Sequence, residues 1–227
     1  MSDFKFLEID ELISELEKYT FNQLHIHHTW KPTHRNFTGY NHIALQKAMK
    51  NYHTNSLAWS NIGQHLTLFP DGVWLTGRPF DTRPASISGW NTGALAVEMI
   101  GNFDRPDTMI YNDLGYDVLE GKQKEEILKL MRYFIDKYGQ DTIVFHRDNP
   151  NAGKSCPGTS LNKESLIQEA KLIAQENDCH WGEEYYNNLA RKGIILDEKR
   201  YHDYLTRAEG MALVDKVTDW LMEYFMT

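Results

Sequence analysis

Three short stretches of the chain carry side chains that could bind a metal ion. His146 and Cys156 flank a short loop, and the upstream segment 24–29 is rich in histidine. Together they offer imidazole and thiolate ligands, with no obvious fourth side chain. Three nitrogen and sulfur ligands beside an open position are typical of catalytic zinc, whereas structural zinc sites usually fill all four positions. The chain therefore presents the residues of a hydrolytic zinc site.

The upstream segment leaves open which histidine would bind. Its alternating apolar residues indicate a strand, in which successive side chains point to opposite faces. His27 and His28 therefore cannot reach the same metal, and His25 shares a face with His27. A lone histidine in a strand is more often a hydrogen-bonded polar group than a ligand. The downstream histidine and cysteine make a ligand role the better interpretation here.

Cys156 lies in a loop, 153–158, whose glycines and proline make it a poor place for a core cysteine, although a buried small hydrophobe is the commonest role of a lone cysteine. Lys154 would stabilise a thiolate there, and its ammonium could stabilise the oxyanion of a tetrahedral intermediate. The alternative is a solvated surface lysine. A disulfide with Cys179 would consume the ligand, so a reducing compartment fits better.

Glu98 is the single carboxylate in an otherwise apolar run, 94–100. A carboxylate in a buried strand is costly unless a partner compensates for its lost hydration. One interpretation is a structural ion pair with an arginine such as Arg78. The interpretation that we favour is a general base whose raised pKa suits it to deprotonate water at a metal site.

Apolar periodicity divides the chain into interleaved helices and strands. The strands are expected at 23–29, 64–69, 94–100 and 142–145, with a turn at 70–72 that leads into a return strand. The helices are expected at 7–19, 40–52, 119–138 and 161–174. This order predicts an α/β fold, with a central mixed β-sheet flanked by helices.

A second, smaller module is expected at the C-terminal end. Residues 178–227 hold ten acids against six Lys and Arg, and two helical patterns cover 181–192 and 207–225. We therefore predict a catalytic domain at 1–176 and a small helical module at 177–227. The net charge of −8 argues against nucleic-acid binding, and no stretch approaches the length of a membrane span. The N-terminal residues are too acidic for a signal peptide, so synthesis in the cytoplasm is expected.

The chain resembles the zinc-dependent N-acetylmuramoyl-L-alanine amidases, which include phage lysozyme-type amidases and peptidoglycan recognition proteins. The matching segments run in order from HHT (27–29), FTGYNH (37–42) and YH (52–53) through WSNIGQH (59–65), PDG (70–72), TGR (76–78) and Asn91 to AVEMIGNFD (96–104), HRD (146–148) and KSCPG (154–158). The resemblance covers about residues 20–175. It implies a mixed sheet flanked by helices, and hydrolysis of the amide between N-acetylmuramic acid and L-alanine.

The resemblance also implies roles for particular residues. The Zn²⁺ ligands would be His27, His146 and Cys156, with His28 a neighbour in the strand. Many phage members carry a catalytic tyrosine where this chain has Gln64, and others carry a glutamate in the third strand, where this chain has Glu98. We therefore assign the base role to Glu98 and oxyanion stabilisation to Lys154.

Four residues are expected to contact substrate or water: Gln64, His65, Trp90 and Asn91. The tryptophans in general have two interpretations. Those at 30, 59, 74 and 90 could line a glycan groove, or they could belong to the core.

The C-terminal segment resembles a single S-layer homology motif, at His180–Trp181, 193–195 and 206–209. Such modules anchor proteins to secondary polymers of Gram-positive walls, usually as three copies. Wall binding through 178–227 is thus one expectation. A helical hairpin that packs on the catalytic domain or forms a homodimer is the alternative.

The expected partner is peptidoglycan, and four functions fit it. The first is a phage or prophage endolysin, stored in the cytoplasm and released through a holin pore. A bacterial autolysin would have the same activity. A non-catalytic peptidoglycan receptor is a third, although such members commonly replace the cysteine ligand and Cys156 is present. A recycling amidase that acts on soluble muropeptides is the fourth.

Overall fold

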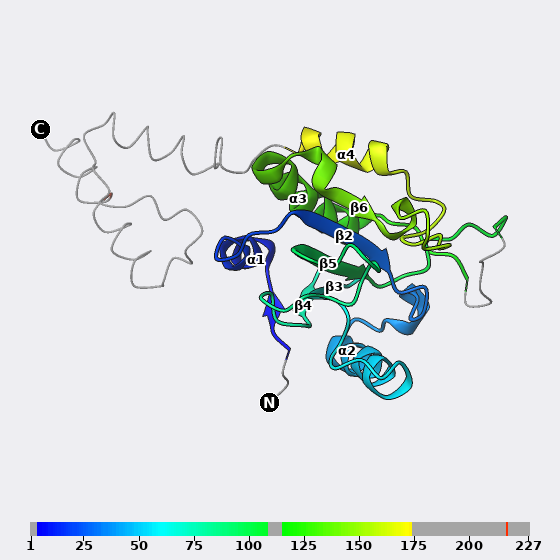
Figure 1. Cartoon of the computed structure of the whole chain (residues 1–227). Coiled ribbons are helices and arrows are strands. Elements are labelled where there is room, and N and C mark those ends of the chain that lie inside the picture. Colours follow the sequence, from blue (N-terminus) through cyan, green and yellow to red (C-terminus); the bar gives the residue numbers. More distant parts are fainter. Residues whose placement is uncertain (1–3, 109–114, 174–216, 218–227) are drawn as a thin grey trace, which may run out of the picture. The chain divides into compact units, whose positions relative to one another are not determined.

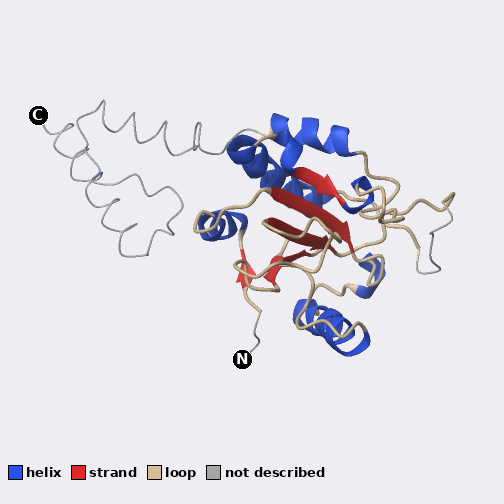
Figure 2. Ribbon diagram, viewed as in Figure 1, coloured by secondary structure: helices blue, strands red, loops and turns tan. Residues whose placement is uncertain are grey.

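The computed structural model describes residues 4–108, 115–173 and 217, and contacts group Met1–Ile173 into one compact unit. Within the described part, helices cover a six-stranded sheet (Figures 1 and 2). The strands are β1 (Phe6–Leu7), β2 (Gln23–His28), β3 (Leu66–Leu68), β4 (Trp74–Thr76), β5 (Ala94–Met99) and β6 (Ile143–Phe145). The helices are α1 (Ile9–Leu16), α2 (His42–Asn51), α3 (Gly121–Tyr138) and α4 (Lys163–Leu172).

The sheet is mixed, as the sequence predicts. Its order is β1-β4-β3-β5-β2-β6. The strands β3, β5, β2 and β6 run parallel to their neighbours, whereas β4 returns antiparallel to β3 across the predicted turn and pairs with β1. The two-residue strand β1 was not expected, because so short a segment carries no periodic signal.

Two apolar clusters hold the layers together. The larger joins α1, α3 and α4 to one face of the sheet, through residues such as Leu12, Phe134 and Leu166 against Ile26 and Val97. The smaller lies on the side of α2 and includes Met49, Phe69, Leu75 and Ile100. The helices therefore flank both faces (Figure 1).

The central strands β2 and β5 separate apolar and polar side chains by face. On β5, Leu95, Val97 and Met99 belong to the large core, so Ala94, Ala96 and Glu98 point to the opposite face. Leu24 and Ile26 on β2 face the core in the same way, and His25 and His27 face the other side. Small alanines beside polar residues leave room on that face for a pocket.

Strand register then brings the polar residues together. His27 on β2 pairs with Glu98 on β5, and Glu98 pairs with Thr67 on β3. Phe145, the last residue of β6, pairs with Ile26, which places His146 beside His27. Ligands bind beyond the carboxyl ends of strands in open α/β sheets, and these side chains lie at that edge.

The predicted helices are confirmed, with shorter bounds at their ends. The helix α2 continues into a π-helical turn, Tyr52–Ser56, and α4 begins after Asn162, whose side chain accepts a hydrogen bond from the Ser165 N–H at 2.8 Å. No helix in the described ranges is long and apolar enough to cross a membrane. The predicted C-terminal module at 177–227 lies outside the described residues, apart from position 217.

Candidate metal centre and active site

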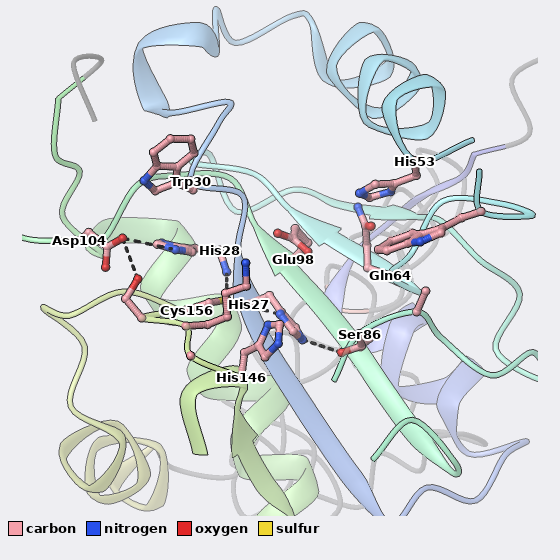
Figure 3. A pocket seen from close by; sticks show the side chains of 16 residues that line it. His27, His28, Trp30, His53, Gln64, Ser86, Glu98, Asp104, His146 and Cys156 are labelled. Carbon is pink, nitrogen blue, oxygen red and sulfur yellow. Dashed lines mark hydrogen bonds and ion pairs between the residues drawn. The ribbon is translucent and has the colours of Figure 1, made fainter. Parts of the chain in front are cut away.

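His27, His146 and Cys156 converge at the edge of the sheet (Figure 3). One ligand atom from each lies within 4.8 Å of the other two. The Cys156 Sγ is 3.4 Å from the His27 Nδ1, and the centroids of the two imidazole rings are 4.8 Å apart. This is the one group of at least three potential metal-ligating side chains that the described part of the chain forms.

Arg147 ties the loop that carries Cys156 to the end of β6. The Arg147 N–H donates to the Cys156 carbonyl at 2.9 Å, and the guanidinium donates to the Gly158 carbonyl at 2.6 Å and to the Leu161 carbonyl. Because Arg147 directly follows His146, this bonding fixes the second and third ligands relative to each other.

Asp104 holds the same loop from the other side. Its fully buried carboxylate accepts hydrogen bonds from the Ser155 hydroxyl at 2.9 Å and the Thr159 N–H at 3.0 Å. His28 completes the frame: its backbone N–H donates to the Cys156 Sγ at 3.4 Å, and its Nδ1 accepts from the Phe103 N–H. The His28 ring is thus a neighbour of the three convergent side chains and lies outside their cluster.

The electrostatics of the three side chains suit a divalent cation. Burial lowers the pKa of His27 well below its ordinary value and also lowers the pKa of His146, so both rings are neutral and can donate lone pairs. Burial, with the negative charge of Glu98, raises the pKa of the Cys156 thiol well above its ordinary value. A cation bound beside this thiol would reverse that shift, because metal coordination deprotonates a thiol.

Glu98 faces the pocket beside these ligands (Figure 3). Its carboxylate makes no hydrogen bond or ion pair with any residue that the structure describes, and burial raises its pKa to about 8. The ion pair with Arg78 does not form, because that guanidinium donates to the carbonyls of Ile62 and Arg83 at 2.8 and 2.9 Å. A partly buried carboxyl without a protein partner is available for proton transfer.

The pocket has a volume of about 620 Å³. Trp30 and Trp59 line it, whereas Trp74 is fully buried in the core and makes a hydrogen bond to Glu126. Lys154 also lines the pocket, from the exposed loop before Cys156. The pocket thus combines aromatic walls with a cation and a carboxyl beside the candidate ligands.

Gln64 contributes an amide to the same pocket. Its side chain is 2% exposed, and its Nε2 donates to the Thr67 hydroxyl at 2.9 Å. The Oε1 atom is buried with no hydrogen-bond partner in the described structure. A buried acceptor without a donor is costly, so this oxygen is suited to accept from a water or substrate N–H.

His65 lies in the protein interior, outside the residues that line the pocket. Its Nδ1 accepts from the Ala96 N–H at 3.0 Å and its Nε2 donates to the Thr82 carbonyl at 2.8 Å. Both ring nitrogens therefore join strands and loops of the fold. The structure does not bring His65 together with the other predicted substrate contacts.

His65 should make stability depend on pH. Burial lowers its folded-state pKa to about 4, against about 6.5 when unfolded. Above pH 6.5 the ring is neutral in both states. As the pH falls from 6.5 to 4, the unfolded chain binds a proton that the folded chain excludes, which should cost roughly 2–3 kcal/mol of unfolding free energy.

Urea unfolding at several pH values measures this loss. The variant His65→Gln should be less stable at pH 7 but lose less stability between pH 6.5 and 4 than the wild type. Parallel curves for the two proteins would mean that His65 is not the group responsible.

Asn91 and Trp90 also lie outside the pocket lining. The Asn91 Oδ1 accepts hydrogen bonds from the backbone N–H groups of Ser86 and Ile87, at 3.1 and 2.8 Å. Trp90 lines a separate hollow with Gly89 and Thr92. Asn91 thus holds a loop beside the pocket, and Trp90 belongs to another surface.

Two lining residues, His53 and Ser86, were not expected from the sequence. The His53 Nδ1 accepts from the Gly63 N–H at 3.1 Å, and its ring lies 4.7 Å from the Trp59 ring. The Ser86 hydroxyl is 2.6 Å from the His27 Nε2 (Figure 3). Neither residue has a periodic or motif signal, although the YH pair at 52–53 belongs to a segment that matches the amidases.

Comparison with known proteins agrees with this geometry. The family model described as N-acetylmuramoyl-L-alanine amidase matches residues 17–159. Peptidoglycan-recognition proteins SC1a and SC1b of Drosophila melanogaster are each 24% identical over 120 residues, which are 52% of this chain and 58% of theirs. The chain therefore spans little more than half the length of these curated relatives.

Solved structures share the fold. N-acetylmuramoyl-L-alanine amidase LysC from Clostridium intestinale URNW is 23% identical, with a TM-score of 0.51 over 67% of this chain and 87% of that one. Drosophila PGRP-LB is 18% identical, with a TM-score of 0.51 over 69% and 82%. Since the family model covers more than half of its residues, the chain belongs to the N-acetylmuramoyl-L-alanine amidase family.

Proposed function

We propose that the protein hydrolyses the amide bond between N-acetylmuramic acid and L-alanine in peptidoglycan, with a zinc ion held by His27, His146 and Cys156. The observation that carries this proposal is the convergence of three ligand atoms within 4.8 Å in a pocket that also holds an unpartnered Glu98 carboxyl. Family membership supplies the bond, and the pocket supplies the chemistry.

The three side chains fit zinc in type and number. Two imidazoles and one thiolate leave a coordination position open, as catalytic zinc requires. When bound, zinc polarises a carbonyl and makes water a stronger nucleophile at neutral pH.

Glu98 moves the protons in this proposal. Its carboxylate takes a proton from the attacking water and passes it to the leaving nitrogen, so that the amide and one water become a lactyl carboxylate and a free amine. The folded-state pKa of about 8 would fall toward neutrality beside a bound cation. The carboxyl would then accept and release a proton near physiological pH.

Lys154 and Gln64 act on the substrate. The Lys154 ammonium, on the pocket rim, stabilises the oxyanion that develops on the carbonyl oxygen. The unpartnered Oε1 of Gln64 accepts a hydrogen bond from a water or a substrate N–H. These two roles require no change of fold between the free and bound protein.

An enzyme is favoured over a non-catalytic receptor by the complete ligand set. A receptor needs the pocket walls but has no use for a thiol beside two imidazoles and an unpaired carboxyl. A structure of Drosophila PGRP-LB in complex with tracheal cytotoxin shows that proteins of this fold bind such ligands, and binding alone therefore does not separate the two.

We also propose a lytic role at the bacterial wall, as an endolysin or autolysin. A structure titled endolysine N-acetylmuramoyl-L-alanine amidase LysCS from Clostridium intestinale URNW, 23% identical, shares the fold. Residues 178–227 would attach the enzyme to a wall polymer or form a homodimer.

Digestion of purified Gram-positive peptidoglycan tests the activity. New L-alanine amino termini should appear, vanish with a chelator and return on addition of zinc. Intact walls and soluble muropeptides are digested in parallel, and a lytic enzyme should prefer walls. New reducing ends would instead indicate a glycosidase. Binding without either product would identify a receptor, and preference for soluble fragments would indicate recycling.

A further inference from the structure

A chain of hydrogen bonds runs along one face of β2 behind the candidate metal centre. The His27 Nε2 is 2.6 Å from the Ser86 Oγ, and the same hydroxyl is 2.9 Å from the His25 Nδ1. The His25 Nε2 is 2.8 Å from the Gln23 Oε1. Gln23, His25 and His27 alternate along the strand, so all three side chains point to the same face.

Hydrogen counting sets the direction of this chain. The Gln23 carbonyl oxygen can only accept, so the His25 Nε2 must carry a hydrogen. His25 is fully buried between an amide and a hydroxyl, and a neutral ring carries only one hydrogen. Its Nδ1 therefore accepts from the Ser86 hydroxyl.

The same count fixes His27. A serine hydroxyl has one hydrogen, and Ser86 has donated it to His25. Ser86 must therefore accept from the His27 Nε2–H. The Nδ1 of His27, which faces Cys156 at 3.4 Å, is left with a free lone pair. The opposite direction would place a hydrogen on this Nδ1 and block it as a ligand.

The loop that carries Ser86 is held firmly. The Asn91 side chain binds the Ser86 and Ile87 N–H groups, the Ile87 side chain is fully buried, and the Asn149 amide donates to the Ser88 carbonyl at 3.0 Å. The hydroxyl is thereby kept between the two rings.

We propose that Gln23, His25 and Ser86 are positioning residues that hold His27 in the Nε2–H tautomer and orient its Nδ1 toward the metal. This inference rests on the proposed zinc site and adds its outer shell. Metal-binding histidines commonly donate their second ring N–H to an acceptor that fixes tautomer and orientation, and loss of such partners typically costs about 10–100-fold in metal affinity or activity.

The first test is ¹⁵N NMR of the full chain labelled at histidine, without metal. His25 and His27 should both appear as Nε2–H tautomers, and His27 should keep its Nε2–H when zinc is added. A Nδ1–H tautomer at His27 in the metal-free protein would overturn the proposal. This measurement needs no variant and no activity.

The second test is zinc affinity, measured by competition with a chromogenic chelator. Ser86→Ala should weaken binding about 10–100-fold, and Ser86→Thr, which keeps the hydroxyl, should restore it. Gln23→Leu should weaken binding less and mix the His27 tautomers, whereas Gln23→Glu keeps an acceptor and should bind normally. The matched control is Ser88→Ala, in the same loop, which should bind like the wild type.

The outcomes separate this proposal from the proposed function. Wild-type affinity in Ser86→Ala, with zinc bound by the wild type, would refute the positioning role alone. If the wild type does not bind zinc, the zinc amidase fails, and the tautomers still decide whether the chain of hydrogen bonds has the proposed direction.

Discussion

Replacing Cys156 with serine should abolish amide hydrolysis and most zinc binding. Serine keeps the size of the side chain but offers a hydroxyl in place of a thiolate, so two imidazoles remain to hold the metal. The loss of zinc affinity should exceed the roughly 10–100-fold that removal of an outer partner costs. Chelator competition and the release of L-alanine amino termini measure the two effects.

The fold should survive this change, because the loop is held by Arg147 and Asp104 through their own hydrogen bonds. Circular dichroism of the metal-free proteins checks this. Cys179→Ser makes the same chemical change at the other cysteine and should leave zinc affinity and activity intact. If Cys156→Ser retained tight zinc binding, the thiol would not be a ligand.

The variant Glu98→Gln should lose turnover by about 10²–10⁴-fold, the usual contribution of a general acid or base. Glutamine has the same shape but cannot exchange a proton. Zinc affinity should stay within about threefold of the wild type, because Glu98 is not among the proposed ligands. Turnover close to that of the wild type would show that another group moves the proton.

The same variant separates a catalytic role from a structural one. The folded-state pKa of Glu98 is raised to about 8, so its carboxyl stabilises the fold least above that pH, where it must be buried with its charge. Removing the charge should therefore raise the unfolding free energy of the metal-free protein at pH 8–9, by roughly 1–3 kcal/mol. A structural ion-pair partner would instead destabilise the protein when replaced.

The control for this variant is Glu125→Gln, the same substitution on the exposed face of α3. It should change neither turnover nor stability. Thermal or urea unfolding with zinc removed gives the stability comparison, and the peptidoglycan assay gives turnover. Loss of turnover together with loss of stability in Glu98→Gln would favour the structural interpretation.

The sequence carries most of the fold because hydrophobic periodicity is local. Strands β2 and β5 are marked by apolar runs, and α3 by helical spacing. Their register is not local: the pairing of His27 with Glu98, and of Ile26 with Phe145, joins segments far apart in the chain. Residue types could suggest a metal site, but strand pairing is what closes it.

Predictions for individual polar residues depended on burial, which residue type does not reveal. His65 and Asn91 look like substrate contacts in the sequence, yet both bond to backbone groups of the fold. Ser86 carries no sequence signal, because a serine in a loop is ordinary until its position beside two imidazoles is known. Side chains with one hydrogen-bonding partner to find are the hardest to place in advance.

The pairing of β2 has a consequence for the cell that makes the protein. This strand is translated early, but its partners β5 and β6 come much later, and Cys156 follows both. A nascent chain therefore holds His27 without its neighbours until nearly the whole domain has left the ribosome. Partial translation products that stop before Cys156 lack the ligand set, so the producing cell meets wall-cutting activity only from completed domains.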